Sequence, residues 1–117
     1  MSMNPEEFIS AVEELVLGNE IPDPTLIEKG EFPTGWVEAY TLLLKENRLY
    51  WQNINTWPRS LTALFYRVGF NIPYAYREWQ RKANLSNPQT EKLLHSVHFC
   101  TELFLNCSPS AEWPNET

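Results

Sequence analysis

The chain has 117 residues, of which 43% are apolar and 14% aromatic, and its formal net charge is −6. This apolar content excludes a disordered chain, and the length fits a single domain built around one hydrophobic core. No apolar run approaches the roughly 20 residues that cross a bilayer, and the acidic N-terminal stretch lacks the apolar core of a signal peptide. We therefore expect a cytoplasmic protein with no membrane partner.

Helix start signals open the chain. Asn4 is a good capping residue, and Pro5 fits the first turn, where its missing N–H costs no hydrogen bond. Apolar residues then recur at three- and four-residue steps, which predicts a helix over 5–17. A second proline start follows Asp23, and Gly30 ends a short helix there.

The rest of the chain is also predicted to consist of helices separated by short breaks. Proline, threonine, glycine and asparagine signals bound four further helices, over 35–51, 58–69, 73–83 and 88–106. The sequence contains no alternating apolar pattern of the kind that β-strands show. We therefore predict an all-α, single-domain bundle of five or six short helices with proline-initiated starts, spanning 1–107, and a flexible tail at 108–117.

Charge is divided unevenly along the chain. Residues 1–47 contain ten acidic residues and two lysines, whereas residues 48–82 contain five arginines and one lysine against a single glutamate. Two arrangements are compatible with this pattern. The acidic N-terminal helix could neutralise the basic segment within the fold, which is the favoured arrangement, or the basic segment could stay open to an anionic partner.

The basic segment 48–82 also contains nine of the sixteen aromatic residues. Arginine and large aromatic side chains together carry much of the binding energy at protein interfaces. The leading hypothesis is therefore a small non-enzymatic interaction or adaptor module that binds another protein, or itself, through this segment. The residues expected to contact the partner are Trp57, Arg59, Arg67, Tyr74, Arg77 and Arg81.

An alternative is a helix-turn-helix-like regulator that binds nucleic acid. Gly69 would permit the tight turn, and the second helix at 73–83 would present arginine and glutamine to base edges and phosphates. Two features oppose this alternative: the chain is acidic overall, and Phe65 stands where the motif needs a small residue. The residues expected to make the contacts are Tyr74, Arg77, Gln80 and Arg81.

A weaker alternative is a metal site on the last helix, which contains both histidines of the chain. Four potential ligands recur there at steps of four, three and four residues, so they form one stripe on the helix. They are Glu91, His95, His98 and Glu102. Their spacing matches no known helical zinc or di-iron motif, and the stripe is expected to face water. Because no catalytic constellation is evident, we expect neither enzymatic activity nor a cofactor.

Overall fold

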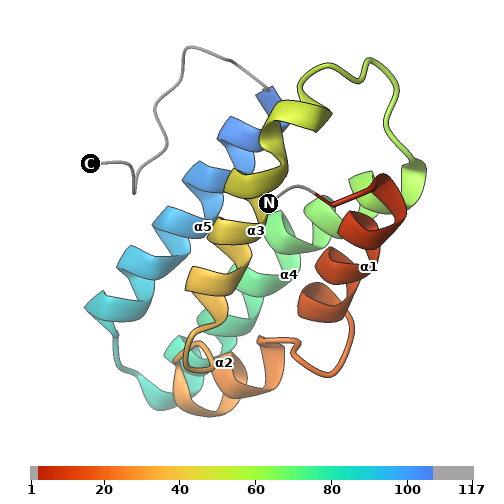
Figure 1. Cartoon of the computed structure of the whole chain (residues 1–117). Coiled ribbons are helices and arrows are strands. Elements are labelled where there is room, and N and C mark those ends of the chain that lie inside the picture. The colour runs from red at the N-terminus through yellow and green to blue at the C-terminus, as the bar shows by residue number, and fades with distance from the viewer. Residues whose placement is uncertain (1–2, 107–117) are drawn as a thin grey trace.

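The computed structural model describes residues 3–106, which form five α-helices around an apolar core (Figure 1). The helices are α1 (Pro5–Val16), α2 (Asp23–Lys29), α3 (Trp36–Trp51), α4 (Arg59–Ala83) and α5 (Pro88–Asn106). The predicted all-α bundle is therefore confirmed. None of the described helices is long and apolar enough to cross a membrane. The predicted flexible tail at 108–117 lies outside the described residues.

Local capping explains where the first helices begin and end. The Glu7 N–H donates to the Asn4 side chain at 2.9 Å, and the Asn4 N–H donates to the Glu7 carboxylate at 3.2 Å. This reciprocal pair and Pro5 fix the start of α1. Gly30 ends α2 with a φ of 66°, a left-handed conformation that glycine adopts without strain. The proline-initiated starts predicted for α1, α2 and α5 are confirmed.

The predicted break near Gly69 is wrong. α4 continues through Gly69 and Pro73 as one helix of 25 residues. A proline inside a helix costs about 3 kcal/mol and a glycine about 1 kcal/mol. Packing outweighs both costs, because buried residues follow one helical period along the whole of α4, which packs against α1 and α2. These buried residues are Leu61, Leu64, Phe65, Val68, Ile72, Ala75 and Tyr76.

The core joins α3 and α5 closely, and α1 packs beside α4 (Figure 1). The Phe8 ring of α1 packs against Trp51 of α3 and Phe104 of α5, with centroids 5.5 Å apart in both pairs. The hydroxyls of Tyr40 and Thr101 share a buried hydrogen bond of 2.7 Å between α3 and α5. Burial raises the pKa of the Tyr40 hydroxyl, so it stays protonated.

α4 and α5 run antiparallel and are connected by residues 84–87 (Figure 1). They touch near both ends of their shared length. At one end the rings of Phe65 and Phe104 lie 5.5 Å apart, and at the other the Tyr76 hydroxyl donates to the Glu91 carboxylate at 2.6 Å. Contact between these two points is sparse, because α4 is positioned mainly by α2 and α1, and α5 by α3. A groove therefore remains between α4 and α5.

Candidate binding groove between α4 and α5

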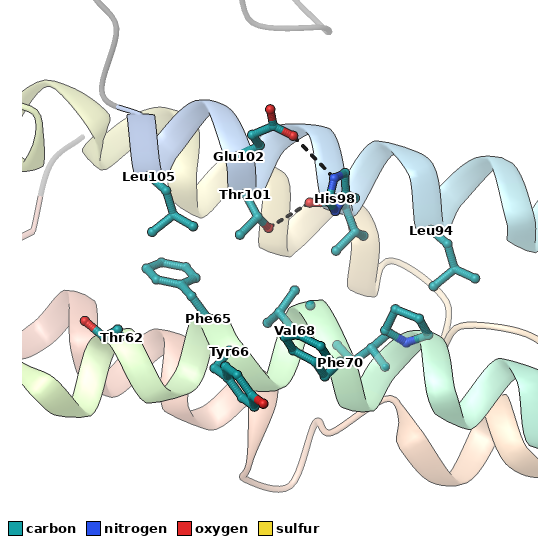
Figure 2. A pocket seen from close by; sticks show the side chains of 14 residues that line it. Thr62, Phe65, Tyr66, Val68, Phe70, Leu94, His98, Thr101, Glu102 and Leu105 are labelled. Atoms are coloured by element: carbon teal, nitrogen blue, oxygen red, sulfur yellow. Dashed lines mark hydrogen bonds and ion pairs between the residues drawn. The ribbon is translucent and has the colours of Figure 1, made fainter.

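The groove has a volume of about 370 Å³, and its walls are largely apolar. Figure 2 shows Phe65 pointing from α4 toward α5, with Leu105 and Leu94 pointing back from α5. The lining extends from Thr62 to Pro73 along α4, which corresponds to about 16 Å, or three helical turns. The apolar lining includes Phe65, Val68 and Ile72 of α4 and Leu94, Val97 and Leu105 of α5.

The middle of the groove is open because no large side chain crosses it. Gly69 is exposed there, and a Cβ atom at this position would meet no atom within 4 Å. On α5, the Thr101 hydroxyl turns back to the Val97 carbonyl at 2.7 Å. Because Pro73 has no N–H, the Gly69 carbonyl lacks the donor that a regular helix supplies. The middle of the α4 wall is thus formed by a residue without a side chain, in a stretch of helix that lacks one regular backbone hydrogen bond.

Three exposed aromatic side chains form an aromatic stripe along α4, and two of them, Tyr66 and Phe70, line the groove. Tyr66, Phe70 and Tyr74 follow one another at four-residue steps and are 62%, 60% and 61% exposed. The rings of Tyr66 and Phe70 stack with their centroids 4.4 Å apart. Large exposed aromatic area beside an apolar groove is typical of a surface that binds a partner.

Three arginines share the outer face of α4 with the aromatic stripe. Arg59, Arg77 and Arg81 are exposed and fall within an arc of about 40° around the helix. Arg81 donates to Glu78, which also accepts the Tyr74 hydroxyl at 3.0 Å. The hydrogen bond from Arg81, and then that from Tyr74, lowers the pKa of Glu78. Four of the six residues predicted to contact a partner therefore share one face.

The acidic N-terminal helix does not neutralise these arginines. α1 packs against the buried side of α4, away from the outer face. Within residues 3–106, neither Arg59 nor Arg77 forms an ion pair, and Arg81 pairs with a glutamate of its own helix. The arrangement that the sequence favoured, with acidic residues covering the basic segment, is thus not found on this face. The outer face of α4 remains cationic.

The other two predicted contact residues lie elsewhere. Trp57 packs against the core with its ring 5.5 Å from that of Phe104, and its indole N–H donates to the Ile54 carbonyl at 2.9 Å. Arg67 is half-buried, and its Nε has no hydrogen-bond partner among the described residues. Burial raises the pKa of Asp23 in α2, and the positive charge of Arg67 is one of the effects opposing this rise. Neither side chain therefore belongs to the cationic outer face.

The helix-turn-helix alternative required two helices separated by a turn, and that predicted geometry is wrong. The second helix predicted at 73–83 is the C-terminal half of α4 and not a separate recognition helix. Continuous packing of the buried side of α4 removes the turn that the motif needs. Three of the four predicted nucleic-acid contacts stay on the outer face, but Gln80 is half-buried and donates to the Ser86 hydroxyl at 3.1 Å.

The histidine–glutamate stripe of α5 does not converge on one point, and only two of its four residues, His98 and Glu102, belong to the groove. His98 Nε2 lies 3.3 Å from Glu102 Oε2, and both residues line the groove (Figure 2). Glu91 is instead engaged by the Tyr76 hydroxyl. In the described part of the chain, no three His, Cys, Asp or Glu side chains are grouped so that they could hold a metal ion. All four residues are exposed, as expected: Glu91, His95, His98 and Glu102.

Sequence reasoning missed the groove and two residues of the aromatic stripe. The helices predicted over 58–69 and 73–83 left Phe70 in the break between them, and Tyr66 was given no role. A signal was present, however. Once α4 is a single helix, Tyr66, Phe70 and Tyr74 fall on the face opposite its buried residues, where large aromatic side chains need an explanation.

Comparison of the chain with protein-family models, with curated proteins and with solved structures gives no match. Its function is therefore inferred from the groove, the aromatic stripe and the charges around them.

Proposed function

We propose that the protein is a small interaction module that binds an apolar segment of another protein in the groove between α4 and α5. The observation that carries this proposal is the aromatic stripe, whose three side chains are about 60% exposed beside the apolar groove. Covering such area stabilises a complex by roughly 25 cal/mol per Å² of apolar surface, before the costs of association. Arg59 and Arg77 supply the charged surroundings that accompany an apolar interface centre.

The lining of the groove favours a protein ligand over nucleic acid. A nucleic acid has few apolar groups that could fill a groove lined by Phe65, Ile72 and Leu105. The rim on α5 carries Glu102, which repels phosphate. A protein segment supplies apolar side chains directly, so it uses the groove and the aromatic stripe together.

The proposal is tested by selecting ligands from an unbiased peptide library and comparing two leucine substitutions on α4. Gly69→Leu fills the open middle of the groove, and it favours the helix because leucine is a better helix former than glycine. Ser60→Leu adds the same side chain at an exposed position of α4 outside the groove lining. Selected peptides should bind the wild type and Ser60→Leu alike and lose binding to Gly69→Leu.

Chemical-shift perturbation then locates the bound peptide. Shifts are expected at lining residues such as Val68 of α4 and Val97 of α5. The proposal fails if no peptide distinguishes the wild type from Gly69→Leu. It also fails if the perturbed amides cluster on α2 or α3 instead.

A further inference from the structure

We infer that the segment bound in the groove is an acidic amphipathic helix of about 18 residues, an inference that rests on the proposed function. The groove is about 16 Å long. Apolar anchors at i, i+4, i+7 and i+11 of a helix span the same distance, at about 1.5 Å per residue. This anchor pattern is the usual one when an amphipathic helix lies in a hydrophobic groove.

A helix fits the groove better than an extended strand. A strand binds by adding backbone hydrogen bonds to an exposed sheet edge, whereas both walls here are helices whose backbone groups bond within the helix. A bound helix satisfies its own backbone and needs only side-chain contacts. The missing side chain of Gly69 also lets a second helix approach α4 closely.

The charges around the groove specify where the acidic residues of the occupant lie. Arg59 precedes the groove lining on α4 and Arg77 follows it, so the two are about 27 Å, or five helical turns, apart. The opposite rim, on α5, carries Glu102 beside His98. The occupant therefore places carboxylates near both of its ends on the side that faces α4, and avoids them opposite Glu102. This spacing sets the length of about 18 residues.

A second copy of the chain is a poor occupant. If two α4 helices met antiparallel about a two-fold axis at Phe70, Arg59 of one copy would lie opposite Arg81 of the other. The one carboxylate in α4, Glu78, is already bonded to Arg81. Like charges facing each other across an interface oppose association. The acidic helix α1 of a second copy could not serve either, because its apolar side is buried in its own core.

The test uses three synthetic peptides of 18 residues and the full-length protein. The first has leucine at the four anchor positions and glutamate near both ends on one flank. The second has lysine in place of each glutamate, and the third has the first peptide's composition without an apolar face. By fluorescence anisotropy, the glutamate peptide should bind about tenfold more tightly than the lysine peptide, as expected for two rim ion pairs. Its affinity should fall with added salt, and the third peptide should not bind.

Charge reversal provides the decisive comparison. The double variant Arg59→Glu/Arg77→Glu should prefer the lysine peptide, which restores the pairing with opposite sign. A matched control, Lys29→Glu/Lys92→Glu, changes the net charge equally at two exposed lysines outside the groove lining and should retain the wild-type preference. Gly69→Leu should abolish binding of both charged peptides.

Several results would overturn the inference. Equal affinity for the glutamate and lysine peptides would contradict the inference that the partner is acidic. A dimer in sedimentation that Gly69→Leu dissociates would identify a second copy as the occupant. If Trp113→Ala changes the chemical shifts of groove residues in the absence of peptide, the occupant is a segment of the same chain. Competition by duplex DNA for the same site would identify a nucleic acid. If library peptides bind in the groove but lack an acidic helical pattern, only this inference fails, and the proposed function stands.

Discussion

Replacing Gly30 with alanine is expected to lower the free energy of unfolding by about 3 kcal/mol. Gly30 has a φ of 66°, where a residue with a side chain costs about 1 kcal/mol. A Cβ atom at Gly30 would also overlap the indole ring of Trp79, which must then shift. Overpacking of this kind costs about 1–3 kcal/mol. Any shift also disturbs the Gly30 carbonyl, which accepts from the Thr90 hydroxyl at 2.7 Å and the Asn87 amide at 3.2 Å.

Gly35→Ala is the matched control for this experiment. Gly35 also has a positive φ, 80°, but a Cβ atom there would meet no atom within 4 Å. Its substitution should therefore cost only the backbone strain, about 1 kcal/mol. Both values are measured by urea unfolding followed by circular dichroism. If the two variants lose the same stability to within about 0.5 kcal/mol, the contact between Gly30 and Trp79 does not determine the effect, and the reasoning is refuted.

Three further predictions concern the core and the groove wall. Gly69→Ala should raise the free energy of unfolding by about 1 kcal/mol, because alanine favours the helix and its Cβ meets no atom; a lower urea midpoint would contradict this. Tyr40→Phe should cost about 1–2 kcal/mol by removing the buried hydrogen bond to Thr101, and a double-mutant cycle with Thr101→Val should show strong coupling. Burial raises the pKa of Cys100 to about 11, so in a Cys107→Ser background its thiol should resist thiol reagents near pH 8 until the protein unfolds. Because the folded state favours the neutral thiol, burial of Cys100 contributes to the free energy of unfolding below the ordinary pKa of cysteine, and this contribution is lost as the pH rises toward 11. Fast labelling of the folded protein would argue against this burial.

The helix ends set by local chemistry could be predicted from the sequence. The reciprocal cap of Asn4 and Glu7 and the left-handed stop at Gly30 involve residues only a few positions apart. Such signals depend little on the rest of the fold, so they were interpreted correctly. The same rules failed at Gly69 and Pro73, because burial along the whole of α4 outweighed the local cost of two helix breakers.

The groove itself depends on tertiary packing that the periodicity of a single helix does not encode. α4 is placed by α2 and α1, and α5 is placed by α3, so the gap between α4 and α5 results from two separate sets of contacts. The sequence predicted that the last helix has one solvent-exposed side and one apolar side. It did not show that Leu94 and Leu105 line an open groove. Charge composition located the basic segment, but it favoured coverage of the arginines by acidic residues. Within residues 3–106, Arg59 and Arg77 instead form no ion pair, because α1 packs on the opposite side of α4.

The presence of Gly69 and Pro73 inside the single helix α4 affects where this helix can bend. Its contacts to α5 at Phe65 and Tyr76 act as two fixed supports, and Gly69 and Pro73 weaken the backbone between them. A helix bends most easily where a proline interrupts its backbone hydrogen bonds. Any change in the width of the groove would therefore bend α4 near Gly69 and Pro73, and the packing of α4 against α1 and α2 limits how far that bend can go.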